Sequence, residues 1–389
     1  MLDPNKLKAA LVLKKEEFAN AELALLEDIK TLREALQNFS SLSFDEIQRC
    51  LSEIPKPGAR PTAEHTRYSS IVVPFQNNWT NKQESLAWAK DILLGTPTIA
   101  ADGSQIPPSK DLSIPVGVVQ VGWYENKHQV DGKYVKDIQL EVLSSNELSE
   151  DEQEEGGFPD WIINWKRFEM EVNCLVDYME RHKDDLVKPV CFFDGSLIVS
   201  FVQHMLPSRQ RKYTDIVQEL IAKSTETRVP FVGFVDTSYA NDIIVMLNHI
   251  YDHHMRRRVG DPALLNPFMK WGDRSQVYVC ARDDNVEARY YENINFVYLK
   301  TSSDHPPARV EFPRWVFDEN IHEKVINIVR AETLVGNGYP YPAETVDALA
   351  VLTMEDRDHF LRIFQEFTEE NHLSLRFSRK TISKRMRRG

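Results

Sequence analysis

The order of strand and helix patterns along the chain constrains the fold more than any other feature of the sequence. Between residues 98 and 144, three segments rich in β-branched and aromatic residues follow one another with short connections, which predicts an antiparallel meander. From about residue 158 onward, helical patterns alternate with short, almost entirely apolar segments such as PVCFFDGSL and VPFVGFVDTS. Strands of that composition are buried on both faces of a sheet. The sequence therefore predicts an α/β fold in which a mixed sheet is flanked by helices.

The N-terminal region is predicted to be helical. Apolar residues recur at helical period between Leu11 and Leu36, and Ser43 is placed to cap a short helix. Such an arm either packs on the body or serves dimerisation or partner docking. The segment PKPGARPTAEH is rich in Pro and Gly and predicts a linker. The predicted organisation is a helical arm over residues 1–54, a linker over 55–69, an α/β domain over 70–375 and a basic tail over 376–389.

Two apolar β-type segments run directly into Asp-Gly-Ser. TIAADGSQI places Asp102 at the end of one predicted strand, and VCFFDGSLI places Asp194 at the end of another. An ionised carboxylate in such a position is costly unless water, donors or a metal neutralise it. Asp-Gly-Ser is also ordinary turn chemistry. Because both copies follow apolar strands, in the element order of ribonuclease H-like folds, we predict that the two aspartates share divalent metal ions.

The helix predicted over about residues 158–184 offers a further carboxylate. Glu169 and Glu171 flank its apolar stripe on opposite sides, and helical geometry does not decide which one reaches the sheet. Hard divalent cations take oxygen ligands, so several carboxylates must converge to hold them. Two such ions can activate water and stabilise the leaving oxygen of a phosphodiester. The pattern therefore favours phosphodiester hydrolysis with Mn²⁺ or Mg²⁺, as two ions.

Three blocks of the sequence, in this order, resemble the NurA nuclease family. They are TIAADGSQI, then RFEME followed by CFFDGSL, and GNGYPYPAETVDALA, and the resemblance extends over about residues 70–360. It implies a ribonuclease H-like (Piwi-like) core, a homodimer, and manganese-dependent endonuclease and 5′–3′ exonuclease activity on single- and double-stranded DNA ends. It also implies a partnership with HerA, a hexameric translocating ATPase, in DNA end resection and repair.

The same resemblance implies roles for individual residues. Tyr339 would lie near the scissile phosphate, and Asp347 stands where some members of the family have histidine. Both residue types bind metals, and aspartate favours the harder ion. The metal ligands would be Asp102, Asp194, Glu171 and Asp347, and the catalytic set would be Asp102, Glu171 or Glu169, Asp194, Tyr339 and Asp347.

Composition limits the remaining alternatives. A net charge of −12 argues against DNA binding over the whole surface, although the basic tail could grip a phosphate backbone. The four cysteines have no metal-binding spacing, and neither a signal-peptide core nor a long apolar stretch is present, so a cytoplasmic protein is expected. The chain lacks a nucleotide-binding P-loop. Two other functions remain open: a non-catalytic scaffold or assembly subunit of a DNA-processing complex, and a ribonuclease.

Overall fold

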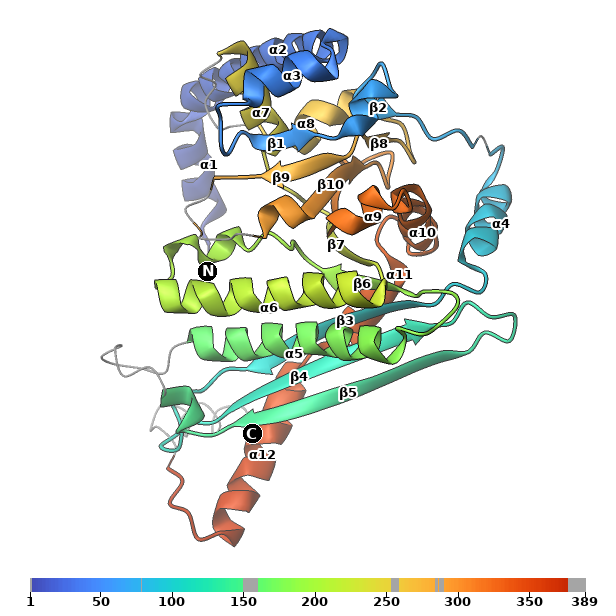
Figure 1. The fold of residues 1–389 in the computed structure, drawn as a ribbon. Coiled ribbons are helices and arrows are strands. Elements are labelled where there is room, and N and C mark those ends of the chain that lie inside the picture. The colour runs from blue at the N-terminus through green and yellow to red at the C-terminus, as the bar shows by residue number, and fades with distance from the viewer. Residues whose placement is uncertain are drawn as a thin grey trace. The chain divides into compact units, whose positions relative to one another are not determined.

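The chain folds into two compact units, each assembled from segments that are distant in sequence (Figure 1). The computed structural model describes residues 2–77, 79–149, 160–252, 259–283, 286 and 290–376. The first unit comprises Met1–Trp79 and Phe234–Asp318, and the second comprises Thr80–Gly233 and Glu319–Gly389. The domain predicted over residues 70–375 is thus divided between the two units. All but the first residue of the predicted basic tail lies outside the described residues.

The first unit begins with the predicted helical arm, which forms α1 (Pro4–Leu13), α2 (Lys15–Ser41) and α3 (Phe44–Leu51). Ser43 caps α3 in a reciprocal capping box with Glu46. The segment predicted as a linker is instead folded, because β1 (Gly58–Pro61) pairs antiparallel with β9 (Tyr278–Ala281). Gly and Pro are tolerated in β1 because it lies at the edge of its sheet.

The rest of this unit is a small sheet with short helices. The strand order is β1-β9-β10-β11, and β2 and β8 extend the sheet beside β10. Asp273 and Arg274 are buried and structural, since Asp273 accepts the Phe75 and Lys270 amides while Arg274 pairs with the buried Glu64. The remaining elements are β2 (Val72–Val73), α7 (Asp242–Tyr251), α8 (Asp261–Leu265), β8 (Arg274–Ser275), β10 (Ile294–Leu299), β11 (Ala308–Pro313) and α9 (Arg314–Asp318).

The second unit contains the predicted meander. Strands β3 (Thr98–Ile106), β4 (Gly117–Asn126) and β5 (Tyr134–Leu143) pair antiparallel in succession. Strand β6 (Val190–Asp194) pairs parallel with β3, and β7 (Phe231–Val235) follows β6, so the order is β7-β6-β3-β4-β5. The prediction of a mixed sheet with alternating helices is therefore confirmed.

Helices cover both faces of this sheet. A side chain on Gly103 of β3 would meet Arg167 and Glu171 of α5, whereas one on Gly122 of β4 would meet Leu349 of α11. Gly122 is the register partner of Asp102, which neighbours Gly103. Because successive residues of a strand face opposite sides, α5 and α11 lie on opposite faces. The helices are α4 (Lys82–Leu93), α5 (Asp160–Arg181), α6 (Pro207–Thr227), α10 (His322–Val335), α11 (Tyr341–Ala350) and α12 (Met354–Glu370).

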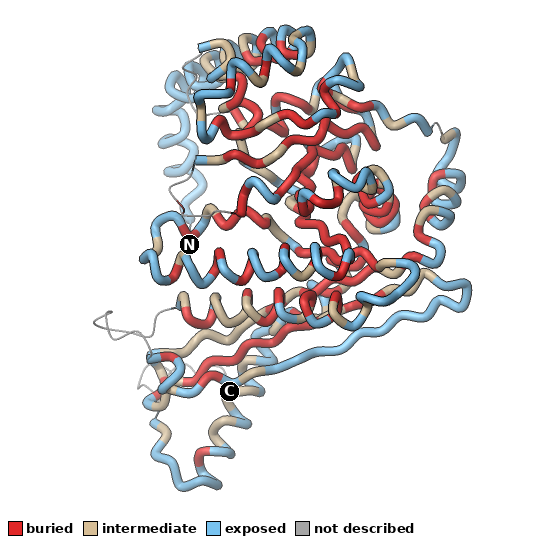
Figure 2. Tube along the Cα trace, viewed as in Figure 1, coloured by how far each residue is buried: buried red, intermediate tan, exposed pale blue. Residues whose placement is uncertain are grey.

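Burial follows the composition of the strands (Figure 2). The apolar residues of β6 are all buried, as are most of β3 and β4, while β5 is largely exposed at the end of the strand order. The helices that the structure describes include none with the length and apolar character needed to cross a lipid bilayer.

Candidate metal centre on two parallel strands

The two Asp-Gly-Ser aspartates lie side by side. Ala101 of β3 is in register with Phe193 of the parallel strand β6, so the next residue of each strand is Asp102 and Asp194. Neighbouring strands are roughly 4.8 Å apart, and residues in parallel register share a face of the sheet. The strand register therefore places the two aspartates next to each other where β6 ends. The prediction that Asp102 also ends its strand is wrong, because β3 continues to Ile106.

Two further predicted residues come from the α11 side of the sheet. The Tyr339 hydroxyl donates a hydrogen bond to the Asp194 carboxylate. Asp347 lies in α11, and its charge raises the pKa of Asp102. The segment from Tyr339 to Asp347 therefore brings a phenol and a carboxylate to the face on which Asp102 lies.

Glu171 reaches the same strand end from the opposite face. It projects from α5 and is only 6% exposed, and its Oε1 would lie 2.8 Å from a Cβ atom placed on Gly103. The glycine that follows Asp102 therefore makes the room that the Glu171 carboxylate occupies. Alanine at this position would displace Glu171 or Arg167, so the glycine is required by the close approach of α5 as well as by turn chemistry.

Burial and like charge perturb this carboxylate group. Desolvation raises the pKa of Glu171 to about 8, and the charges of Asp102 and Asp194 add to the increase. Desolvation also raises the pKa of Asp102 to about 6, helped by Asp194 and Asp347. The charges of Asp102 and Asp194 therefore act on Glu171, and a bound cation would relieve this repulsion.

Arg167 partly offsets the negative charge. Its Nη1 lies 3.6 Å from Glu171 Oε1 and donates to the Gly103 carbonyl oxygen over 3.1 Å. The Arg167 charge lowers the pKa of both Glu171 and Asp102, against the larger effect of burial. At 3.6 Å the contact is too long for a hydrogen bond, and Glu171 Oε1 is buried without a hydrogen-bond partner among the residues that the structure describes.

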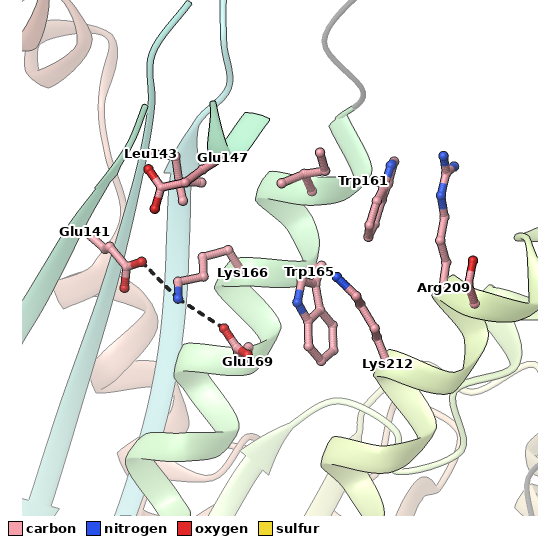
Figure 3. A pocket seen from close by; sticks show the side chains of 11 residues that line it. Glu141, Leu143, Glu147, Trp161, Trp165, Lys166, Glu169, Arg209 and Lys212 are labelled. Carbon is pink, nitrogen blue, oxygen red and sulfur yellow. Dashed lines mark ion pairs between the residues drawn. The ribbon is translucent and has the colours of Figure 1, made fainter. Parts of the chain in front are cut away.

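Glu169, the other helix carboxylate, does not join this group. Its side chain pairs with Lys166, which also pairs with Glu141 of β5 (Figure 3). Glu169 therefore lies on the face of α5 turned away from Glu171. Asp236, which follows β7, is exposed and belongs to the first unit.

The donors present fit a hard divalent cation. As the side chains stand, the described residues include no group of three or more His, Cys, Asp or Glu ready to hold a metal ion. The set nevertheless consists of oxygen donors from β3, β6, α5 and α11, and one buried carboxylate oxygen has no hydrogen-bond partner among the described residues. Oxygen donors of this kind are those that Mg²⁺, Mn²⁺ and Ca²⁺ select.

Two residues of the site did not emerge from the sequence. Arg167 is placed four residues before Glu171 on the same helix, and that spacing is the one local signal that could have identified the pair. Gly103 was interpreted as a turn residue, although it lies inside β3, which continues to Ile106. The sequence alone gives no indication that a helix packs closely against this glycine.

Comparison with known proteins identifies the family. A family model, described as the NurA domain, matches residues 96–352. No curated protein matches the chain. A crystal structure of NurA with manganese is similar at 11% identity, over 68% of this chain and 88% of that chain, with a TM-score of 0.38. An Aquifex aeolicus Argonaute structure is similar at 10% identity, over 67% of this chain and 29% of that chain, with a TM-score of 0.28. Because the match to the NurA family model spans well over half of the sequence, the chain belongs to the NurA family.

Proposed function

We propose that this protein is a divalent-metal-dependent DNA nuclease with a ribonuclease H-like core. The observation that carries the proposal is the placement of Asp102 beside Asp194 on two parallel strands, with the buried Glu171 close enough for both charges to raise its pKa. The strand order β7-β6-β3-β4-β5, with an antiparallel meander, supports the fold assignment. Membership of the NurA family supports DNA as the substrate.

Asp102, Asp194, Glu171 and Asp347 would hold the metal, which we propose to be Mn²⁺ or Mg²⁺, as two ions. When bound, such ions polarise a phosphodiester and lower the pKa of water. Tyr339 orients the Asp194 carboxylate by donating a hydrogen bond to it. Arg167 supplies positive charge beside Glu171 and leaves the buried Oε1 without a hydrogen bond. We therefore assign Glu171, and not Glu169, as the helix ligand.

The proposal is tested with purified protein on linear single- and double-stranded DNA. We expect degradation with Mn²⁺, none with EDTA, and recovery when excess Mn²⁺ is added back. RNA of matched sequence in the same assay separates a deoxyribonuclease from a ribonuclease. Inactivity with Mn²⁺, Mg²⁺ and Ca²⁺ alike, from protein that is folded by circular dichroism, would contradict the proposal and favour the scaffold function.

Family membership also supports proposals about assembly and context. We propose that the chain forms a homodimer, works with a HerA-type hexameric ATPase on DNA ends in resection and repair, and cuts as an endonuclease and a 5′–3′ exonuclease. A cytoplasmic location stays a prediction from the sequence. Light scattering of the chain alone, and co-purification with a HerA-type ATPase, would test the two assembly proposals.

Gly103→Ala is expected to lower the nuclease rate by roughly tenfold while leaving the protein folded. The added methyl group would lie 2.8 Å from both Glu171 Oε1 and Arg167 Cγ, and positional errors of about 1 Å cost large factors in rate. Gly117→Ala is the matched control, because its methyl group would lie 2.8 Å from the flexible end of Ile163, away from the carboxylates. Equal rates for the two variants in Mn²⁺ would contradict the role given to Gly103.

A further inference from the structure

A groove of about 430 Å³ crosses α5 on the side turned away from the carboxylate site. The α5 residues that line it are spaced along one helix face, and at 100° per residue that face is centred nearly opposite Glu171. Strand β5 and the turn at Glu147–Ser149 form one wall, and the first turns of α6 form the other (Figure 3). The volume lies in the range of small-ligand pockets, roughly 300–1,000 Å³.

The α6 wall is basic and lies against the indole of Trp161 from α5. The Arg209 guanidinium lies 4.5 Å from the centroid of the Trp161 ring, and Lys212 Nζ lies 5.4 Å from it. Arg209 is only 8% exposed, so a charged group is built into this wall. Ser208 lies in the first turn of α6, whose N-terminus has no side-chain cap. Pro207 has no N–H, and the Arg209 and Gln210 amides donate to the Leu206 carbonyl, so the Ser208 amide is the helix N-terminal donor that, with the two cations, favours an anion such as a phosphate.

The wall formed by β5, the turn at Glu147–Ser149 and part of α5 is acidic, and one lysine offsets part of its charge. Lys166 Nζ lies 2.9 Å from Glu141 and 3.1 Å from Glu169, and it bridges the two carboxylates (Figure 3). Glu147 accepts the Ser144 hydroxyl over 2.7 Å. These carboxylates retain free acceptor capacity, which suits an N–H donor of a nucleobase, such as N3–H of thymine. The groove therefore combines a phosphate-binding wall, an indole face and a wall of acceptors.

We propose that this groove binds a nucleotide of single-stranded DNA, with its base stacked on the face of the Trp161 ring opposite Arg209 and its phosphate at Lys212, Arg209 and the start of α6. The inference rests on the proposed function, which makes DNA the substrate. Stacking on an indole requires an unpaired base, because both faces of a base in a duplex are covered. The groove would hold the DNA strand at a distance from the carboxylates. It would therefore contribute to DNA affinity and not to the cleavage step.

The test measures DNA binding in EDTA, where a metal-dependent nuclease does not cut. Fluorescein-labelled (dT)₁₂ is titrated by anisotropy at several salt concentrations, and intrinsic tryptophan fluorescence is followed in parallel. Lys212→Gln is expected to weaken binding by roughly three- to tenfold and to reduce the slope of log affinity against log salt by about 0.7, the loss of one phosphate contact. Arg211→Gln is the matched control, since Arg211 is exposed on the same helix and does not line the groove.

A second variant tests stacking without changing charge. Trp161→Leu is expected to weaken (dT)₁₂ binding by about tenfold, which is in the range of one lost base–aromatic stack. It is also expected to remove most of the quenching of intrinsic tryptophan fluorescence that (dT)₁₂ causes. Trp88→Leu on α4 is its control, and thermal melts establish that each variant is folded. Inorganic phosphate at millimolar concentration should displace (dT)₁₂ from the wild type more than from the Lys212→Gln variant.

Three results would overturn the inference. They are equal affinities of Lys212→Gln and Arg211→Gln, unchanged quenching in Trp161→Leu, and equal affinity of wild type for single-stranded and duplex DNA. These measurements are independent of cleavage. A protein that degrades DNA with Mn²⁺ but binds (dT)₁₂ without Trp161 and Lys212 refutes the groove alone. A protein that binds through the groove and never cleaves refutes the nuclease alone.

Discussion

Asp102→Asn is expected to lower the Mn²⁺-dependent nuclease rate by at least about a hundredfold. Asparagine keeps the size of the side chain but removes the negative charge that a divalent ion needs beside Asp194. Losing one group that stabilises transition-state charge costs on the order of 10²–10³ in rate, and a shared ligand should cost no less. Initial rates on linear DNA at saturating Mn²⁺ provide the measurement.

The control for Asp102→Asn is Asp137→Asn, which makes the same change on the exposed strand β5. The Asp137→Asn variant should retain full nuclease activity. The metal dependence adds a sharper comparison, because weakened ion binding raises the Mn²⁺ concentration at half-maximal rate, whereas misfolding lowers the rate at every concentration. Activity within a few-fold of wild type in Asp102→Asn would show that the carboxylate group described here is not the catalytic centre.

The pairing of Asp102 with Asp194 was predictable because its determinants are local. Each aspartate ends an apolar segment, and buried strands of that kind lie next to one another in an α/β sheet. The register that aligns Ala101 with Phe193 was not predictable, and it matters, because a shift of one residue would turn the two carboxylates to opposite faces of the sheet. The sequence could predict that the two strands are neighbours, but not that their aspartates share a face.

The choice between Glu169 and Glu171 depended on packing that no local pattern encodes. The two residues lie about 200° apart around α5, so the rotation of the helix decides which one faces the sheet. That rotation is fixed by contacts with distant segments, including Phe168 against Phe193 of β6 and Tyr213 of α6, and by the space at Gly103. Residues 167–171 carry no signal of these contacts.

The incorrect prediction of a linker over residues 55–69 has the same cause, because the structure of this segment also depends on contacts with distant residues. Residues 55–69 are rich in Pro and Gly, which usually mark a break in structure. Here β1 pairs with β9, more than 200 residues later, and the buried Glu64 binds Arg274 of β8. The partners of this segment lie beyond the first stretch of the second unit, Thr80–Gly233, so composition read in a short window could not reveal that the segment belongs to the core of the first unit.

Glu171→Gln is expected to abolish nuclease activity and yet to stabilise the metal-free protein at alkaline pH. The folded-state pKa of Glu171 is raised from 4.5 to about 8. Between these two values the folded chain keeps a proton that the unfolded chain has lost, so the stability of the wild type falls as pH rises through this window. Glutamine cannot ionise, and the variant escapes that loss.

The expected gain for Glu171→Gln is on the order of 1 to 3 kcal/mol at pH 8.5 in EDTA, because one pKa unit is worth about 1.4 kcal/mol and a buried amide has its own desolvation cost. At pH 4.5 and below, the gain should vanish. Urea unfolding at pH 5 and pH 8.5 measures it, with Glu169→Gln as the control expected to follow the wild type. Added Mn²⁺ should make the wild type more stable than Glu171→Gln at pH 8.5, since the ion binds and stabilises the wild type and not the variant. A Glu171→Gln protein that is less stable than wild type at alkaline pH without metal would mean that Arg167 fully compensates the Glu171 charge, and the site would then have no need of a cation.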